Sequence, residues 1–312
     1  MRISRTLGDV RHDPGGRALA IGVFDGVHLG HRAVISPAGE MARERGLAHT
    51  VLTFDPHPRS VLTPDEPASY LTGPEVKAEL IAGLGPSELI VIPFTRALAR
   101  VRAERFAEIL MAPPIGAAAI AVGENFRFGH QGAGDPGLLR RMGAGRGVEV
   151  VSPPMVRSDD GGRISSTRIR GLVAAGDVSG AAALLGRDHL IEGPVIAGAG
   201  RGRTLGIPTA NLDLPLDQAV PAPGVYAARL MRGGESLPAA VNVGRAPTFA
   251  GEHGALMVEA HAIGYTGPDF YDERVRIAFR RRLRDEKRFS GPDELVAQIR
   301  RDIVEAEEAA SG

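Results

Sequence analysis

Residues 22–31 read Gly-Val-Phe-Asp-Gly-Val-His-Leu-Gly-His, and they govern how the first half of the chain folds. They follow the small and apolar run Ala18 to Ile21, typical of a buried strand, and precede a helix-like segment that begins near Gly30. A glycine-rich turn between a strand and a helix presents backbone N–H groups to phosphate. His28 and His31, three residues apart on a first helical turn, can direct both rings at one anion. The stretch therefore predicts an α/β domain with an anion site.

The rest of the first half alternates short apolar runs with helix-like segments. The expected strands are Leu19–Phe24, Thr50–Phe54, Leu89–Phe94, Ala118–Val122 and Val148–Val151. The expected helices are Arg32–Arg45, Pro74–Gly83 and Ala103–Met111. This order predicts a doubly wound parallel sheet. Pro37 falls inside the first expected helix, where it predicts a kink or a late helix start.

The character of the sequence changes after Gly186. Strand-like runs separated by turn residues follow, at Ile191–Ile196, Val225–Leu230, Ala239–Val243, Leu256–Ile263 and Val275–Phe279. This pattern predicts an antiparallel barrel or sandwich. A helical pattern returns at the C-terminus, over 292–308. We expect two domains, residues 1–186 and residues 187–312.

Composition restricts the class of protein. The 312 residues carry a formal net charge of zero, so no global field draws the chain to nucleic acid or to an anionic membrane. There is no cysteine, which excludes disulfides, thiolate zinc sites and a cysteine nucleophile. No apolar run approaches the roughly 20 residues that a spanning helix needs. We expect a soluble, cytoplasmic protein without nucleic-acid or membrane partners, and its self-association is left open.

Three later segments of the first half are consistent with the same anion site. Ser165, Ser166, Thr167 and Arg168 place hydroxyl donors and a guanidinium at a helix start, which suits phosphates, although an ordinary capping sequence looks the same. The segment 123–129 offers Asn125 and two phenylalanines to a flat ring, or else its aromatics belong to the core. Residues 54–58 either line the crevice that contains this anion site or form a stiff structural loop.

The order of these motifs resembles the adenylyltransferase module of prokaryotic bifunctional riboflavin kinase/FAD synthetases. The resemblance implies a nucleotidylyltransferase fold that transfers AMP from ATP to FMN with Mg²⁺, giving FAD and pyrophosphate. It implies that His28 and His31 contact the ATP phosphates and that Asn125 holds the flavin. Ser165 to Arg168 would close over the triphosphate. On this basis the expected catalytic residues are His28, His31 and Arg168, and the expected ligand-binding residues are Gly22, Phe24, Gly30, Asn125, Ser165, Ser166 and Thr167.

The second half carries its own candidate residues for phosphate chemistry. Gly202 and Arg203 belong to a glycine- and arginine-rich loop that could cover phosphates, and no Walker sequence is present. Thr209 and Asn211 present two oxygen ligands that suit a hard cation such as Mg²⁺, or else they stabilise a turn. Glu259 lies in a strand where a carboxylate suits a base near a substrate hydroxyl, or else it faces solvent.

These motifs resemble the riboflavin kinase module of the same family, which is a six-stranded Greek-key barrel. The resemblance implies that Thr209 and Asn211 ligate Mg-ATP and that Glu259 activates the riboflavin 5′-hydroxyl, giving FMN and ADP. The chain departs from the family pattern at 188–189 (Asp-His), 261–265 (His-Ala-Ile-Gly-Tyr) and 269–272 (Asp-Phe-Tyr-Asp). Two alternatives stay open: a single-activity adenylyltransferase with a degenerate kinase module, and a flavin-binding protein without turnover.

Overall fold

The computed structural model describes residues 1–65, 69–197, 207–245, 256–268 and 270–311. The chain forms two compact units. One comprises Met1–Ala68 and Pro74–Ser165, and the other Ser69–Gly73 and Ser166–Gly312. The division lies ahead of Gly186, so the expectation that the enzyme modules meet near Gly186 stays a prediction. Within the described ranges, none of the helices combines the length and the apolar character needed to cross a membrane.

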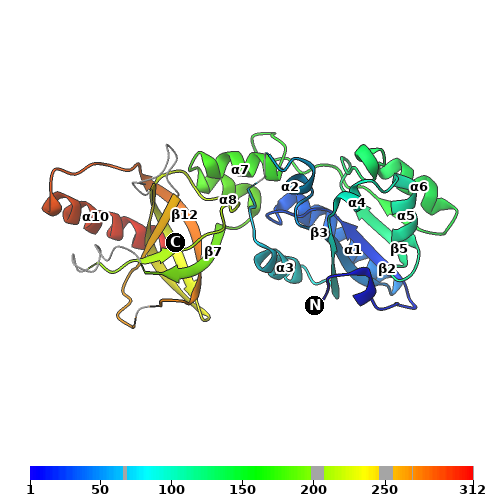
Figure 1. Ribbon diagram of the computed structural model, residues 1–312, viewed down its shortest axis with the longest axis horizontal. Coiled ribbons are helices and arrows are strands. Elements are labelled where there is room, and N and C mark those ends of the chain that lie inside the picture. Colours follow the sequence, from blue (N-terminus) through cyan, green and yellow to red (C-terminus); the bar gives the residue numbers. More distant parts are fainter. Residues whose placement is uncertain (66–68, 198–206, 246–255, 269, 312) are drawn as a thin grey trace. The chain divides into compact units, whose positions relative to one another are not determined.

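The first unit is built on a parallel sheet, which its described part forms from six strands (Figure 1). Their bounds are β1 Arg2–Ser4, β2 Arg17–Ile21, β3 Ala48–Asp55, β4 Glu88–Pro93, β5 Ala117–Val122 and β6 Glu149–Val151. Their order across the sheet is β1-β4-β3-β2-β5-β6. After β2 the chain winds one way through β3 and β4, and then the other way through β5 and β6. The winding therefore reverses beside β2, where doubly wound sheets open a crevice for a ligand.

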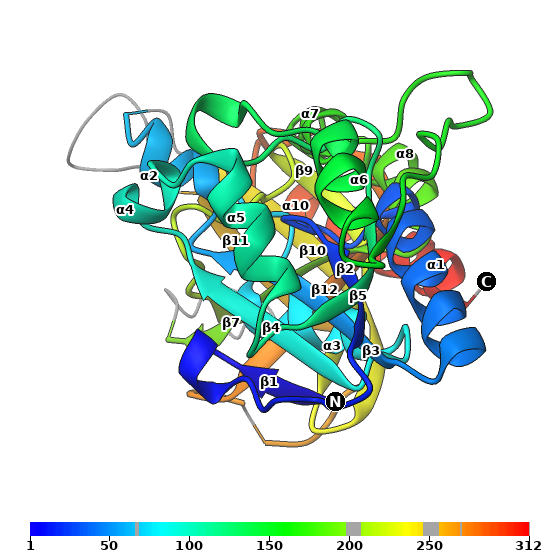
Figure 2. The same cartoon turned by 90° about the vertical axis from the view of Figure 1, so that its right-hand side faces the viewer.

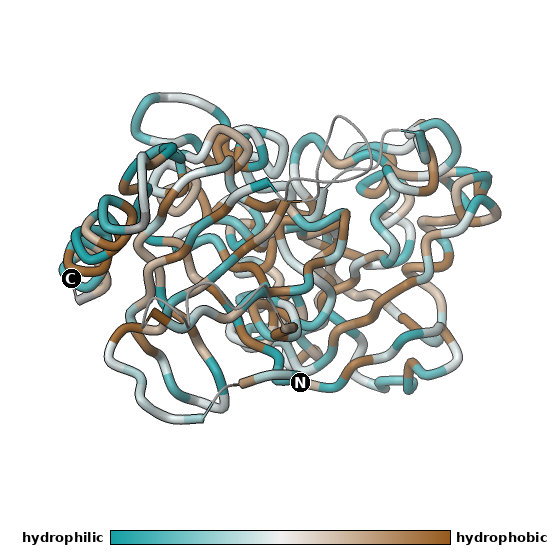
Figure 3. Tube along the Cα trace, turned by 60° about the vertical axis from the view of Figure 1, so that its left-hand side comes forward, coloured by the Kyte–Doolittle hydropathy of each residue, from teal (hydrophilic) through white to brown (hydrophobic). Residues whose placement is uncertain are grey.

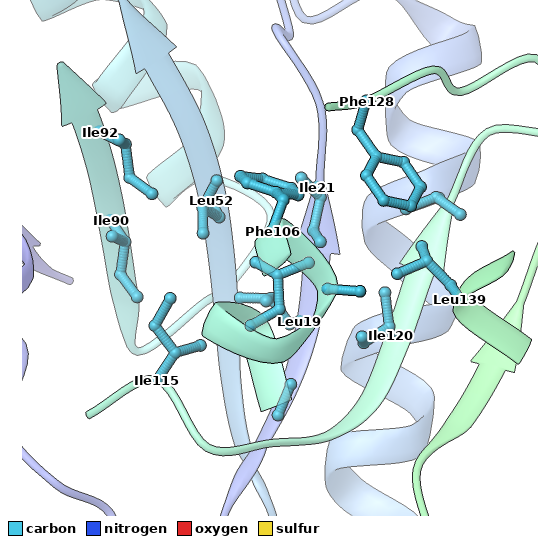
Figure 4. Close-up of a cluster of buried hydrophobic side chains, with 14 of the residues drawn as sticks. Leu19, Ile21, Leu52, Ile90, Ile92, Phe106, Ile115, Ile120, Phe128 and Leu139 are labelled. Carbon is cyan, nitrogen blue, oxygen red and sulfur yellow. The ribbon is translucent and has the colours of Figure 1, made fainter. Parts of the chain in front are cut away.

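Helices cover both faces of this sheet, as Figure 2 shows from a second side. The helices of the unit are η1 Leu7–Asp9, α1 Leu29–Arg45, α2 Pro58–Leu62, α3 Pro74–Ala82, α4 Arg96–Ala99, α5 Ala103–Met111, η2 His130–Gly132 and α6 Pro136–Ala144. One face packs against α5 and α6, with Leu19, Ile21 and Leu52 meeting Phe106 and Leu139 (Figure 4). The other face packs against α1 and α3. The predicted doubly wound sheet is confirmed.

Two of the element boundaries that differ from the sequence prediction lie beside the histidine motif. The strand expected to reach Phe24 ends at Ile21, because Phe24 takes a left-handed conformation with φ of 53°. The helix expected from Arg32 begins at Leu29, with Pro37 inside it, so the late start predicted from this proline is wrong.

The strands of the second unit close into an antiparallel barrel in the order β10-β11-β8-β7-β12-β9. Their bounds are β7 His189–Ile196, β8 Ala210–Leu212, β9 Gly224–Arg232, β10 Glu235–Arg245, β11 Leu256–Ala262 and β12 Arg274–Arg284. β9, β10 and β11 follow one another as a meander, and β8 lies beside β11, which is a Greek-key arrangement. The barrel alternative is therefore the correct one.

The described part of this unit also contains helices α7 Ser166–Ala174, α8 Val178–Leu185 and α10 Pro292–Ser311. α8 packs against β7 and β12, whereas α10 packs along β9 and β10 on the outside of the barrel (Figure 1). Figure 3 shows hydrophobic and hydrophilic residues alternating along α10, as an amphipathic surface helix requires. Ile303 and Ala306 pack against Ala227 of β9, and the barrel interior is filled by aliphatic and aromatic side chains.

Candidate functional site

The loop after β2 is held in a strained conformation. Phe24, Gly26 and Val27 all have positive φ angles, of 53°, 83° and 40°. Such angles are costly for phenylalanine and for a β-branched valine, and they persist where the surroundings enforce them. The Thr53 hydroxyl of β3 donates to the Val23 carbonyl at 2.9 Å, and the Phe24 ring is 1% exposed in the core. Strain of this kind is concentrated at functional sites.

The two histidines of the motif stack at the start of α1. His28 is the N-cap, and its Nδ1 accepts a hydrogen bond from the His31 backbone N–H at 3.2 Å. The ring centroids lie 3.5 Å apart with 17° between the planes, and Phe24 packs edge-on against His31. Since Nδ1 of His28 accepts, a neutral His28 ring carries its proton on Nε2. An imidazole donor thus stands at a helix N-terminus, where the helix dipole favours anions.

Glycines allow the backbone to approach closely around this pair. A Cβ on Gly22 would lie 2.7 Å from the Phe24 ring, and one on Gly30 would lie 3.1 Å from the His28 ring. The same Gly30 position is 3.6 Å from the Ile164 carbonyl, so the residue before Ser165 lies against the first turn of α1. The Phe24 ring contacts protein on all sides, which leaves its backbone for the predicted role in nucleotide binding.

Asn125 lies beyond the end of β5, the neighbour of β2. The register pairs Ile21 with Val122, so the loops carrying His28 and Asn125 leave adjacent strands at the point where the winding reverses. Asn125 is exposed, and its predicted contact with a flavin stays a prediction. The two phenylalanines nearby have a different role: Phe128 is 6% exposed and packs on Phe106, and Phe126 stacks on Phe128. The alternative that these aromatics belong to the hydrophobic core is correct for Phe128.

Ser165 ends the first compact unit, and Ser166, Thr167 and Arg168 form the first turn of α7 in the second. The helix start expected at these residues is confirmed. Thr167 is exposed, and Ser166 and Arg168 are half-buried. Their predicted closure over a triphosphate stays a prediction.

The barrel carries its candidate residues on one outer surface. The register places Asn211 of β8 opposite Glu259 of β11, and Glu259 opposite Asn242 of β10. Directly opposed residues of antiparallel strands project to the same face. The alternate residues Ala210, Leu212, Val258, Ala260, Val241 and Val243 are buried in the barrel core. Asn211, Glu259 and Asn242 therefore form a polar row across three strands, directed away from that core.

The segment before β8 is fixed beside this row. The His261 Nδ1 lies 2.8 Å from the Pro208 carbonyl, a hydrogen-bond distance, and His261 follows Glu259 by two residues on the same face. Thr209 and Asn211 are both half-buried. Gly202 and Arg203 lie outside the described residues. Among the residues that the structure describes, no group of three or more histidine or acidic side chains could hold a metal. The assignment of Thr209 and Asn211 as metal ligands stays a prediction.

A pocket of about 60 Å³ lies beside Thr209. Arg232 supports its wall, and the sequence did not indicate this role. Tyr265 and Phe270 line the pocket, and the Arg232 guanidinium lies 5.0 Å from the Phe270 ring centroid and 5.6 Å from that of Tyr265. Arg232 also donates to the Tyr265 hydroxyl at 2.9 Å and to both oxygens of Glu273. No sequence pattern near Arg232 indicates this contact, because it depends on how the strands of the barrel pair.

The comparisons with known proteins match both halves of the chain. A family model described as FAD synthetase matches residues 10–168, and one described as Riboflavin kinase matches residues 185–310. A bifunctional riboflavin kinase/FMN adenylyltransferase of Pseudomonas fluorescens is 34% identical over 311 residues, covering 100% of this chain and 98% of that protein. The protein of the same description from Escherichia coli strain K12 is 36% identical over 310 residues, covering 99% and 97%.

The fold and the sequence relationship both extend over the full length. The Bacillus subtilis strain 168 protein of the same description is 34% identical over 299 residues, covering 95% of this chain and 93% of that protein. A crystal structure titled as a macrolide-efflux protein from Streptococcus pneumoniae superimposes with a TM-score of 0.85 at 30% identity, covering 96% of both chains. The family models match both units, and the relatives carry one shared description. This chain therefore belongs to the family of bifunctional riboflavin kinase/FMN adenylyltransferases.

Proposed function

We propose that this chain makes FAD from riboflavin in two ATP-dependent steps. The module up to about Gly186 transfers AMP from ATP to FMN, and the module that follows phosphorylates riboflavin to FMN. The observation that carries the proposal is the stacked His28–His31 pair at the N-terminus of α1, beside the reversal point of a doubly wound sheet. The separate polar row on the barrel supports the second activity.

In the AMP transfer, a phosphate oxygen of FMN attacks the α-phosphorus of ATP. A new P–O bond forms, the bond between the α-phosphorus and the bridging oxygen breaks, and pyrophosphate leaves with the electron pair. Negative charge develops on the five-coordinate phosphorus, and His28, His31 and the α1 amides stabilise it. Arg168 contributes a further positive charge to the polyphosphate, with the hydroxyls of Ser165, Ser166 and Thr167 as donors.

The remaining residues proposed for the first module bind the substrates and take no part in the bond changes. Asn125 hydrogen-bonds the flavin, and Gly22, Gly30 and the Phe24 backbone let the nucleotide approach the chain closely. No covalent enzyme intermediate is required, because the acceptor is itself a phosphate.

In the kinase step, Glu259 accepts the proton of the riboflavin 5′-hydroxyl as that oxygen bonds to the γ-phosphorus of ATP, and ADP leaves. Asn211 lies directly opposite Glu259, which supports placing the triphosphate near the base. Thr209 and Asn211 supply the neutral oxygen donors that suit Mg²⁺ when ATP brings the remaining ligands. Bound Mg²⁺ would neutralise phosphate charge. Gly202 and Arg203 would cover the phosphates.

We place the enzyme in the cytoplasm, acting on riboflavin, FMN, FAD, ATP, ADP and pyrophosphate and on neither nucleic acid nor membrane. A sequence without cysteine is compatible with this compartment. The zero net charge supports small anionic substrates over nucleic acid as partners.

The substitution Glu259→Gln tests the division of labour. It keeps the shape of the side chain and removes the base, so riboflavin phosphorylation should fall by about 100-fold or more, while FMN adenylylation stays near normal. Separation of the flavins after incubation with riboflavin or FMN, ATP and Mg²⁺ measures both steps. The adenylylation activity of the same chain is the control for folding.

Other outcomes would contradict the proposal in distinguishable ways. Equal loss of both activities in the variant would refute the assignment of separate sites. A wild-type chain that only adenylylates FMN would indicate a degenerate kinase module, and one that binds flavin without turnover would refute both steps.

A further inference from the structure

Lys77 of α3 is a charged side chain in the interior of the first unit. It is 5% exposed, and no step of the proposed reaction uses it. The chain has 37 lysines and arginines together, of which only Lys77 and Lys287 are lysines. The choice of lysine over arginine matters at a buried position, because an ammonium is a compact charge on a flexible stem, whereas a guanidinium is wide and planar. A buried charge is costly unless it is paired.

The partners of Lys77 lie at the carboxyl end of β3 and in the loop after β2. Its Nζ donates to the Phe54 carbonyl at 3.5 Å, one residue before the end of β3. Burial lowers the pKa of Lys77, and the carboxylates of Asp55 and Asp25 counter this effect by attracting the ammonium. Asp25 is 2% exposed and belongs to the strained loop. The buried ammonium is therefore hydrogen-bonded at the end of β3, and it is attracted by two carboxylates near the carboxyl ends of neighbouring strands.

These strand ends carry the adenylyl-transfer site. The Gly22 N–H donates to the Leu52 carbonyl at 3.2 Å, and the Thr53 hydroxyl holds Val23, so the loop after β2 rests on β3. Asp25 precedes the N-cap His28 by three residues. A shift of Asp25 would therefore move the cap and the stacked rings. Two uncompensated carboxylates at this edge would also repel a polyphosphate, since charges interact over long distances where little water intervenes.

We infer that Lys77 is a positioning residue for AMP transfer: it fixes the loop that carries His28 through Phe54, Asp25 and Asp55, and it offsets their negative charge beside the triphosphate. This inference rests on the proposed function. It assigns Lys77 no contact with substrate.

The substitution Lys77→Met tests the inference, since methionine keeps much of the volume and removes the charge. The KM for ATP in FMN adenylylation should rise by about tenfold, with a smaller change in kcat, because the lost charge acts on the bound polyphosphate. Riboflavin phosphorylation by the same chain should be unchanged. Lys287→Met is the matched control: Lys287 is half-exposed and pairs with Glu294 in the other unit, so its loss should leave adenylylation as it was.

A double substitution separates charge compensation from simple destabilisation. In the Asp55→Asn background, Lys77→Met should cost much less ATP affinity, because the repulsive carboxylate is gone. An unchanged KM for ATP in Lys77→Met, or the same cost in both backgrounds, would overturn the inference.

A spectroscopic measurement covers the case in which Lys77→Met does not fold. Lysine labelled with ¹³C at Cε gives two side-chain signals in this chain, and Lys287→Arg leaves only that of Lys77. The signal should shift on addition of Mg²⁺ with an ATP analogue that cannot release pyrophosphate, and Asp55→Asn should also move it. A signal that responds to neither change would refute the inference. If instead the wild-type chain makes no FAD from FMN, the proposed function fails, and the response to Asp55→Asn still tests the pairing.

Discussion

His189 shows how one residue can depart from the family pattern and still serve the fold. The chain departs from the family pattern at 188–189, and residue 189 is a histidine that is 0% exposed. Its Nε2 lies 2.8 Å from the Ala219 carbonyl, and its ring stacks near Phe279. A carbonyl only accepts, so Nε2 carries the proton. Burial, the main cause, lowers the pKa of His189 to about 4. The imidazole is thus a neutral part of the barrel core.

This histidine should make the stability of the barrel depend on pH. The unfolded chain takes up a proton near pH 6.5, whereas the folded barrel takes it up only near pH 4, so stability is lost as the pH falls through this window. The loss should approach about 3 kcal/mol. Urea unfolding at several pH values measures it. His189→Gln keeps a donor for Ala219 and does not titrate, so a variant with the same pH dependence would contradict this account.

Among the elements, those with a clear local pattern could be predicted from sequence, whereas those that depend on pairing with distant strands could not. The helix over 103–111 has the expected bounds, because its periodicity is local. β8 has three residues and exists through its pairing with β7 and β11, so no local pattern reveals it. Likewise, the histidine pair was visible in the motif, whereas Arg232 and Lys77 become significant only through contacts between distant elements.

Strand β4 is anchored at its amino end by a buried ion-pair network. Glu88 is 4% exposed; it accepts from Ser4 at 2.6 Å and from Arg17 at 3.1 Å, and it pairs with Arg2. Burial alone would raise the pKa of Glu88, but the hydrogen bonds from these three residues outweigh it and lower the pKa. The network joins β1, β2 and β4 at the sheet end opposite the histidine pair.

Removing the Glu88 carboxylate should destabilise the first unit without disturbing the histidine pair. Glu88→Ala leaves the buried Arg17 without its carboxylate partner, so the free energy of unfolding should drop by about 3 to 5 kcal/mol. Glu149→Ala is the control, because its pair with Arg45 is exposed and should contribute about 1 kcal/mol or less. Denaturant unfolding compares the two variants. A similar, small loss in both would show that burial does not strengthen this pair.

At the scale of the whole molecule, each candidate site is built largely within one unit. The histidine pair and Asn125 belong to the unit built on the parallel sheet, and the polar row belongs to the unit built on the barrel. Each unit has its own hydrophobic core. A defect in one site therefore leaves the residues of the other in place.

Two defective chains should complement each other. Glu259→Gln should fail to make FMN, and the double variant His28→Ala/His31→Ala should stop at FMN. If FMN leaves the barrel into solution, a mixture of the two should convert riboflavin to FAD, with a lag while FMN accumulates. Chromatography of the flavins over time measures this conversion. A mixture that accumulates FMN in solution and makes no FAD would contradict the independence of the two sites.

The closure of the barrel and the order of the sheet also bear on self-association by strand pairing. A closed barrel presents no edge strand, and the two edges of the described sheet are β1 and β6, with three residues each. Long exposed edges are the templates on which chains add to one another as cross-β aggregates. This topology leaves little backbone on which another chain could build, so the folded protein should withstand the high concentrations at which edge-rich β-proteins precipitate.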